Sequence, residues 1–345
     1  MIFGKSGWIK GYENDKFELQ FFYLLPHEFK LLDSHQRLSF EVVYETFEDN
    51  VNTFDAHTPI GISSSIVVNR LSYFCNLLGP SFIIDTTCSS TLFPLNCACQ
   101  RIRNGESRTT FCDGQCEAFG ASVNGYVRSE GAGMILLKPL FDAQTVGCRI
   151  LALIRGTATC SDGKMEQQMA SLSGEQQVWL FDRVLRESNV FPSEVNYIQA
   201  HDIGILVSNL VECKSIRRIL NVGRQRGRPI VVGSVKSNVG HQEPAAGIVS
   251  QIKVVYALKH NLIPPTISAH TLNPRIDMKA LNLKIATQIQ SLPAAANENQ
   301  LRTGTVSAFE FRETNVSLIV FKAKVRLVNV LRFWLYLDVV LKHLY

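Results

Sequence analysis

Apolar residues along the chain follow two spacings, one typical of helices and one typical of buried strands. Helical spacing covers residues 33–49, 60–73, 89–103, 173–190, 210–220 and 245–260. Short apolar runs predict strands at residues 81–87, 134–137, 151–157, 197–200, 230–235, 303–309 and 315–321. Because these strands alternate with helices, the pattern predicts an α/β fold with a largely parallel sheet.

Two of the predicted helices have recognisable buried faces. Ser173 and Gln176 have the spacing of a capping box, so a helix is expected to begin there with Phe181 on its apolar side. In the helix over residues 245–260, the spacing predicts a buried apolar stripe that includes Tyr256. Both helices are therefore expected to pack against the sheet.

Composition narrows the class of protein. With 345 residues and 46% apolar content, the chain is able to bury the core of one large domain or of two halves. The formal net charge of +5 is scattered rather than gathered in a stripe, which argues against a nucleic-acid partner. Residues 1–10 lack the apolar core of a secretory signal, so nine cysteines indicate the reducing cytoplasm rather than a disulfide framework.

The last residues of the chain, 325–345, are apolar but interrupted by charges at Arg326, Arg332, Asp338 and Lys342. This segment is too short and too charged for a membrane-spanning helix. We expect an amphipathic helix, or a tail foreign to the domain, and no membrane span.

Three residues with reactive side chains follow predicted strands. Cys88 lies between the apolar run 81–87 and a helix, where unpaired N–H groups and the positive end of the helix dipole favour a thiolate. His201 and His241 also follow strand-like runs. Because open α/β sheets gather chemistry at the carboxyl ends of their strands, the three residues are expected to converge on one pocket. A thiol-based enzyme is the first hypothesis.

The other cysteines do not indicate a metal centre. Cys97 and Cys99 are two residues apart on a predicted helix and so lie on nearly opposite sides. Cys112 and Cys116 have no second pair of cysteine or histidine ligands nearby. We expect no bound metal.

Several strings occur in the order of one family's motifs. GPSFIIDTTCSS (79–90) contains Cys88, VNGYVRSEGAG (123–133) follows it, and GSVKSNVGHQE (233–243) contains Lys236 and His241. Further matches are LLDSHQRLSFE (31–41), IPPT (263–266) and AFEFRETN (308–315). Over roughly residues 17–321 the chain resembles the β-ketoacyl synthases, which are the condensing (ketosynthase) domains of type I fatty-acid and polyketide synthases.

The resemblance implies the thiolase-like α-β-α-β-α layered sandwich, a fold of two halves that is usually found as a homodimer. The N-terminal half would cover residues 1–145 and carry the nucleophilic cysteine. The C-terminal half would cover residues 146–322 and carry the two histidines and the lysine. Residues 323–345 would be an apolar tail outside the family.

The resemblance also implies an acyltransferase of the 3-oxoacyl-[acyl-carrier-protein] synthase type. The Cys88 thiolate would take an acyl chain from a carrier thioester. A malonyl-type extender would then lose carbon dioxide, and N–H donors from His201 and His241 would stabilise the enolate that attacks the acyl cysteine. This is the Claisen condensation of fatty-acid or polyketide biosynthesis.

Other residues and partners have supporting roles by the same resemblance. Lys236 would organise the surroundings of one histidine with Glu212 as its carboxylate partner. The backbone N–H groups of Cys88 and Phe311 would bind the oxyanion of the acyl cysteine. The partner would be an acyl carrier protein or domain, which itself carries the phosphopantetheine, so no cofactor is expected on this domain.

The chain departs from the family pattern at three places. Ile203 and Ile205 replace threonines that contact the pantetheine arm in the family, and each lost hydrogen bond is worth about 0.5–1.5 kcal/mol. Charged residues replace glycines in the turn at residues 310–313, which would crowd the oxyanion site. Pro94 falls inside the helix predicted at 89–103, which costs about 3 kcal/mol unless the helix kinks.

Three family strands also have no counterpart: the first strand, expected before Gly4, and glycine-rich strands expected at residues 50–63 and 107–111. Their loss would expose sheet edges, so we expect an incomplete N-terminal half in a truncated or divergent copy.

Three functions are open on the sequence. The first is a ketosynthase whose turnover is impaired by the departures above. The second is a catalytically impaired remnant of the fold that acts only as a dimerisation or carrier-binding module. The third is a hydrolase that uses Cys88 and one histidine, but a Cys–His hydrolase needs neither the lysine motif nor a second histidine.

Overall fold

The computed structural model describes residues 68–69, 72–73, 76, 78–106, 110–115, 129, 131–162, 173–201, 206–225, 227–267, 276–293, 301–309, 314–323 and 335–341. The helix predicted at residues 33–49 lies outside the described residues. So does most of the helix predicted at 60–73, of which Val68, Asn69, Ser72 and Tyr73 are helical.

The described helices and strands alternate over most of the chain. The helical elements are η1 (Thr87–Ser89), α4 (Leu92–Arg103), α5 (Leu140–Thr145), α6 (Gly174–Ser188), η2 (Pro192–Glu194), α7 (Leu206–Leu220), α8 (Lys236–Val239), η3 (Glu243–Ala245) and α9 (Ala246–His260). The strands are β1 (Thr110–Gln115), β2 (Ala132–Pro139), β3 (Ala152–Ser161), β4 (Val195–Gln199), β5 (Ile230–Gly233), β6 (Leu262–Ile263), β7 (Leu283–Ile285), β8 (Gln290–Ser291), β9 (Thr303–Ala308), β10 (Thr314–Lys322) and β11 (Leu335–Leu341).

Within the described residues, the main sheet has nine strands in the order β1-β2-β11-β3-β10-β9-β4-β5-β7. In this sheet the pairs β4–β5, β4–β9 and β5–β7 are parallel. The other neighbours, which are β1–β2, β2–β11, β11–β3, β3–β10 and β10–β9, are antiparallel. The prediction of a largely parallel sheet is therefore wrong, and the sheet is mixed. The connection between β9 and β10 illustrates the reason. It has five residues, which is enough for an antiparallel hairpin but too short for the crossover that two parallel strands need.

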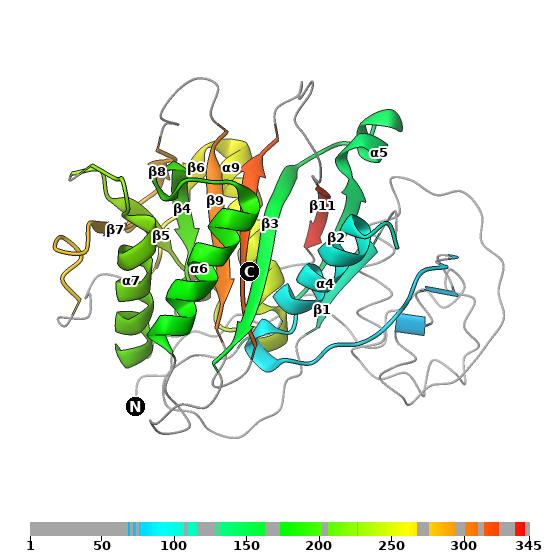
Figure 1. The fold of residues 1–345 in the computed structure, drawn as a ribbon, viewed down its shortest axis with the longest axis horizontal. Coiled ribbons are helices and arrows are strands. Elements are labelled where there is room, and N and C mark those ends of the chain that lie inside the picture. Colours follow the sequence, from blue (N-terminus) through cyan, green and yellow to red (C-terminus); the bar gives the residue numbers. More distant parts are fainter. Residues whose placement is uncertain are drawn as a thin grey trace.

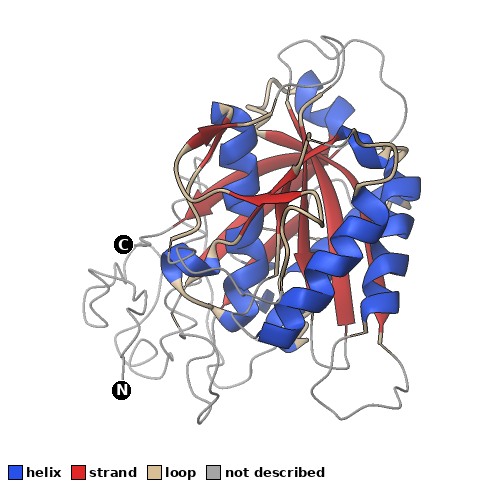
Figure 2. Ribbon diagram, turned by 90° about the vertical axis from the view of Figure 1, so that its left-hand side faces the viewer, coloured by secondary structure: helices blue, strands red, loops and turns tan. Residues whose placement is uncertain are grey.

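Helices cover the sheet on both sides, and each side has its own core. Figure 1 shows α6 and α7 in front of the strands and α9 behind them, and Figure 2 shows the strands between helices from the side. Helices α4 and α9 share one core with Tyr197, while α6 and α7 share the other with Ile198. These neighbours in β4 face opposite cores because side chains alternate along a strand.

The boundaries of α6 agree with the capping signal in the sequence. Ser173 is the N-cap, and its side chain accepts the backbone N–H of Gln176 at 3.2 Å. Phe181 is buried, as its place on the apolar stripe predicts. In α9, however, Tyr256 is 41% exposed, so the prediction of its burial is wrong. Since twelve of the fifteen residues of α9 are buried, only a narrow stripe of this helix is left to face solvent.

The apolar run before Cys88 is not a strand in this structure. Residues 81–86 have no strand pairing with any described residue, and Phe82 and Ile83 are 43% and 46% exposed. A strand needs a neighbouring strand whose backbone N–H and C=O groups pair with its own, and an apolar pattern alone does not provide that neighbour.

One expected defect near the nucleophile helix does not arise in the described residues. Helix α4 begins at Leu92, so Pro94 lies in its first turn, where a backbone N–H has no acceptor inside the helix. The expected cost of a proline in mid-helix therefore does not arise. β1 (Thr110–Gln115) follows this helix and pairs with β2, while residues 107–109 lie outside the described residues, so the strand expected to be missing at 107–111 stays a prediction.

The end of the chain contributes a strand to the main sheet. β11 lies between β2 and β3 and pairs with β2 from Leu335↔Pro139 to Leu341↔Gly133. The prediction of an amphipathic helix is therefore wrong for Leu335–Leu341. An extended segment between two strands satisfies backbone groups on both of its sides, which a surface helix would leave open in β2 and β3. Among the described residues, no helix has both the length and the apolar content needed to cross a membrane.

Candidate active site

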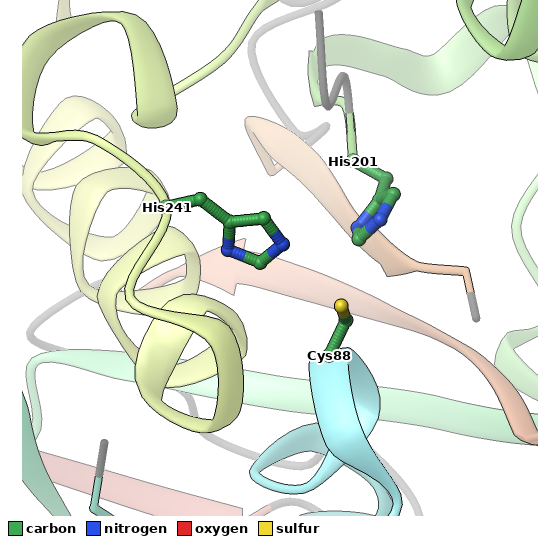
Figure 3. Close-up of side chains that lie close together, drawn as sticks. All are labelled: Cys88, His201 and His241. Carbon is green, nitrogen blue, oxygen red and sulfur yellow. The ribbon is translucent and has the colours of Figure 1, made fainter. Parts of the chain in front are cut away.

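Cys88, His201 and His241 lie together although they are far apart in the sequence. The Cys88 sulfur and one ring nitrogen of each histidine lie within 4.8 Å of one another. Figure 3 shows the Cys88 side chain at the start of its helical segment, directed towards the two rings. The rings are nearly perpendicular, with centroids 5.9 Å apart, and all three residues are buried. The structure thus brings together the three residues that the sequence predicted to converge.

Cys88 is held in a tight turn built from the polar residues around it. It lies in η1, just before α4. Ser90 Oγ accepts the backbone N–H of Thr86 at 2.8 Å and donates to Asp85 Oδ1 at 3.0 Å. Ser89 Oγ donates to the carbonyl oxygen of Thr86 at 3.0 Å. These bonds close the turn on both sides of Cys88 and fix the direction of its side chain.

His201 follows β4 and is anchored through its backbone and its ring. Its backbone N–H donates to Glu212 Oε1 in α7 at 2.8 Å, and its ring packs edge-on to Phe309 with centroids 6.1 Å apart. Lys236 Nζ donates to the carbonyl oxygen of His201 and lies 3.3 Å from its Nδ1. Because an ammonium group only donates, Nδ1 is the acceptor, and we assign the ring proton to Nε2.

The surroundings of His201 keep its ring neutral. Burial, with smaller contributions from the charge of Lys236 and from His241, holds the pKa of His201 well below its ordinary value of 6.5. Desolvation disfavours the charged form of an imidazole, and a neighbouring cation adds to the effect. The ring is therefore a neutral hydrogen-bond donor at physiological pH.

His241 is fixed in the same tautomer by a different device. Its Nδ1 accepts the backbone N–H of Glu243 at 3.0 Å, so its ring proton also lies on Nε2. Glu243 has a φ of +48°, a left-handed conformation that is uncommon for a residue with a side chain. The carbonyl oxygen of His241 accepts the backbone N–H of Ser129 at 3.0 Å, which fixes the main chain at this point.

The arrangement favours hydrogen-bond donation over metal binding. The sulfur and the two nitrogens are close enough together to be considered as ligands of one ion. A metal-bound histidine normally donates its other N–H to a carbonyl or carboxylate group. Here the groups facing Nδ1 of His201 and His241 are donors, so a metal on either Nε2 would leave that ring no site for its proton. The pair is better suited to stabilise a developing oxyanion close to the sulfur.

The structure leaves two of the predicted roles as predictions. The Glu212 carboxylate lies against the backbone N–H of His201, and its predicted pairing with Lys236 is not tested. Phe311 lies outside the described residues, as do Ile203, Ile205 and the turn at 310–313.

Two residues that hold the site were not singled out from the sequence. Glu243 lies in the string that contains Lys236 and His241, but its left-handed backbone is visible only in the structure. Phe309 follows β9 directly and packs against both His201 and Phe181, whose ring centroid lies 6.0 Å away. An aromatic residue at the end of a predicted strand is the only sequence signal for it.

Family models match the chain in two parts. The model described as the β-ketoacyl synthase N-terminal domain matches residues 50–114 and 107–143, and the β-ketoacyl synthase C-terminal domain matches residues 151–270.

Two curated relatives of the chain are much longer proteins. The chain is 33% identical over 359 aligned residues to a phenolphthiocerol/phthiocerol polyketide synthase from Mycobacterium bovis, covering 89% of this chain and 19% of that protein. It is also 33% identical to highly reducing polyketide synthase 40 of Fusarium pseudograminearum, covering 88% of this chain and 14% of that protein. The chain therefore spans less than a fifth of the length of either relative.

Solved ketosynthase structures share the fold. An oxazolomycin ketosynthase domain from Streptomyces albus superposes with a TM-score of 0.81 at 26% identity, covering 94% of this chain and 66% of that one. A ketosynthase of the bacillaene polyketide synthase from Bacillus amyloliquefaciens gives 0.80 at 25% identity, covering 92% and 65%. The thiolase-like fold expected from the sequence is confirmed, and the chain spans just under two thirds of these structures.

Proposed function

The chain belongs to the β-ketoacyl synthase family, and from this premise we propose that it performs acyl transfer to Cys88 followed by decarboxylative condensation. One observation carries the proposal. The two imidazoles, His201 and His241, each have an Nδ1 that faces a donor and so carry a proton on Nε2, and one nitrogen of each ring lies within 4.8 Å of the Cys88 sulfur. A nucleophilic sulfur beside two fixed N–H donors is the set of groups that this reaction needs.

The first step is a thioester exchange. The Cys88 thiolate attacks the carbonyl carbon of an acyl thioester, the new C–S bond forms, and the carrier thiolate leaves and takes up a proton. The backbone N–H groups of Cys88 and Phe311 are proposed to bind the carbonyl oxygen while it carries negative charge. The exchange is nearly balanced in free energy because one thioester replaces another.

The second step forms the carbon–carbon bond. A malonyl-type thioester loses its carboxylate as carbon dioxide, and the electron pair of the broken bond becomes an enolate. The Nε2–H groups of His201 and His241 donate to the enolate oxygen. The enolate carbon then attacks the carbonyl carbon of the acyl cysteine, and the Cys88 sulfur leaves as a thiolate. The cycle returns both rings to their starting protonation.

The partners follow from the chemistry of the substrates. We propose that both thioesters arrive on an acyl carrier protein or domain, with the phosphopantetheine on the carrier and no cofactor bound by this chain. The curated relatives are polyketide synthases, which supports polyketide biosynthesis over fatty-acid biosynthesis. A homodimer in the cytoplasm remains the expected state.

A second candidate function is a catalytically impaired module that only dimerises or binds a carrier. It is favoured by Ile203 and Ile205, which cannot make the hydrogen bonds of the threonines that they replace, and by the charged turn at 310–313. This candidate predicts a folded protein whose Cys88 does not become acylated.

Intact-mass measurement separates the two functions. Purified protein that is folded by circular dichroism is incubated with an acyl thioester. We expect a mass increase of one acyl group in the wild type and in Cys97→Ala, and its complete loss in Cys88→Ala. Cys97 is the matched control because it lies in the neighbouring helix α4 and is half-buried. Folded wild type without the adduct would exclude the acyl transfer and favour the impaired module.

A further inference from the structure

A lysine of α9 is buried close to the active-site loop. Lys253 is 9% exposed, and the three reactive side chains are not among its partners. Its Nζ donates to the carbonyl oxygen of Ser234 at 3.2 Å and to Asn238 Oδ1 at 3.2 Å. Both acceptors belong to the loop that connects β5 to η3 and carries Lys236 and His241.

Burying an amine in this place is unfavourable unless its protons are accepted. A buried ammonium group is costly without hydrogen-bond partners. Burial lowers the pKa of Lys253 to about 8, and no carboxylate is among the partners that its Nζ has in the described residues. The two oxygens of the loop therefore provide the hydrogen bonds that keep the amine inside, and the amine in turn ties these two oxygens together.

The two oxygens bracket Lys236 on both sides. Ser234 precedes Lys236 by two residues, and its Oγ also accepts the backbone N–H of Lys236 at 3.3 Å. Asn238 follows Lys236 by two residues within α8. α8 has only four residues and no side-chain cap, and hydrogen bonds within the turn join Asn238 to Val235 and Gly240 to Lys236. Two contacts from outside add to them, from Lys253 Nζ to Asn238 Oδ1 and from Asn238 Nδ2 to the carbonyl oxygen of Pro265.

Movement of this turn would reach both imidazoles. Lys236 Nζ fixes the tautomer of His201, and His241 follows α8 after Gly240, which has a φ of +83°. By contrast, the hydrogen bonds of Ser89 and Ser90 that close the turn at Cys88 run within residues 85–90. The two hydrogen bonds of Lys253 Nζ therefore go to the loop of the donor pair, whereas the turn of the nucleophile has hydrogen bonds of its own.

We propose that Lys253 is a positioning residue, which holds α8 in the shape that presents Lys236 to His201 and His241 to the enolate. The inference rests on the proposed function, because it assigns Lys253 to the decarboxylation step of that reaction. A positioning role and a merely structural role predict different results for the two half-reactions. Its loss is expected to impair decarboxylation while acyl transfer to Cys88 continues.

The test compares two half-reactions in Lys253→Met, which keeps the length and apolar character of the side chain but removes its donors. Acylation of Cys88 is followed by intact mass, and decarboxylation of a malonyl thioester is followed by the mass of the acetyl thioester product. We expect acylation within about twofold of the wild type and decarboxylation slower by about tenfold or more. Amide hydrogen exchange should be faster in residues 234–241, with little change elsewhere.

Two further variants keep the inference testable. Asn238→Ala at an exposed position removes the acceptor of Lys253 together with the bond from Asn238 Nδ2 to the carbonyl oxygen of Pro265, and should show the same split between the half-reactions. Lys259→Met is the matched control, since Lys259 lies on the same helix, with its Nζ 5.2 Å from the Tyr256 ring centroid. It should behave as the wild type in both half-reactions.

The outcomes separate the inference from the proposed function. An equal loss of both half-reactions, or unchanged decarboxylation in Lys253→Met and Asn238→Ala, overturns the positioning role. If the wild type neither becomes acylated nor decarboxylates the malonyl thioester, the proposed function fails. Hydrogen exchange alone then tests whether Lys253 holds the loop. Unchanged exchange in residues 234–241 of Lys253→Met would show that Lys253 does not hold the loop.

Discussion

Each histidine of the candidate site is held in its tautomer by a donor that lies away from the sulfur. Lys236 serves His201, and the backbone N–H of Glu243 serves His241. Using donors on both Nδ1 atoms leaves both Nε2–H groups available for a negatively charged oxygen. This explains why a lysine is part of the site although it does not need to touch the reacting atoms.

At this scale the structure predicts a pH dependence of stability. The pKa of His201 is below 6.5 in the folded protein, so the unfolded chain binds more protons as the pH falls through this range. The stabilising contribution is therefore complete above pH 6.5 and is lost progressively below it. The free energy of unfolding should fall from pH 7 to pH 5.5 more steeply in the wild type than in His201→Gln, by up to about 1.4 kcal/mol per pH unit.

Urea unfolding of the two proteins across the pH range is the measurement. Above pH 7.5 their curves should run parallel, which provides an internal control. Equal slopes between pH 7 and pH 5.5 would mean that His201 accepts a proton in the folded protein as readily as in the unfolded chain.

Helices α4 and α9 meet at a contact that admits no additional atom. A Cβ on Gly247 of α9 would lie 2.5 Å from Thr91 Oγ1 and 2.7 Å from Leu92 Cγ. Thr91 Oγ1 also accepts the backbone N–H of Ile248 at 3.0 Å. Thr91 is three residues after Cys88, so this contact ties the helix that follows His241 to the turn of the nucleophile.

Gly247→Ala should therefore destabilise the protein by about 1–3 kcal/mol. This is the opposite of the usual effect, since alanine is favoured over glycine inside a helix by about 1 kcal/mol. Gly174→Ala at the start of α6 is the control, because its Cβ would meet Val211 Cγ1 at an ordinary 3.4 Å. Urea unfolding provides both values. A Gly247→Ala protein as stable as Gly174→Ala would contradict the tight contact between α4 and α9.

The last strand of the chain closes a gap in the main sheet. β11 pairs with seven residues of β2 and with three residues of β3, so both of its edges are used. The sequence predicts an incomplete N-terminal half with open edges, and β11 occupies one place where such edges would otherwise lie. How the chain divides into domains is not tested by these contacts, and the proposed halves stay a prediction.

Deleting residues 324–345 should destabilise the whole molecule. Without β11, β2 and β3 lose their ladder partner and present unpaired backbone groups, which promote aggregation. We expect a melting temperature lower by at least about 5 °C and a larger aggregated fraction by light scattering. Deleting only residues 342–345 keeps β11 and should have little effect. An unchanged melting temperature after the larger deletion would show that β11 does not contribute to the stability of the sheet.

The sequence by itself identified the family, the long helices α4, α6, α7 and α9, the strands β2, β3, β4, β5, β9 and β10, and the three side chains that meet. These features depend on local patterns and on ordered motifs, which a linear string contains. Sequence patterns also placed Ser173 as the N-cap of α6, because capping involves residues only a few positions apart.

Only the tertiary structure decided which strands pair and in which direction, that residues 81–86 form no strand in the described part of the chain, and that Leu335–Leu341 are extended. It also decided the tautomers of both histidines and the place of Lys253. These features depend on backbone and side-chain groups that are distant in the sequence and meet only in the fold. An apolar pattern indicates that a segment has a face to bury, whereas the segments that pack against it determine whether it forms a strand and with which neighbour it pairs.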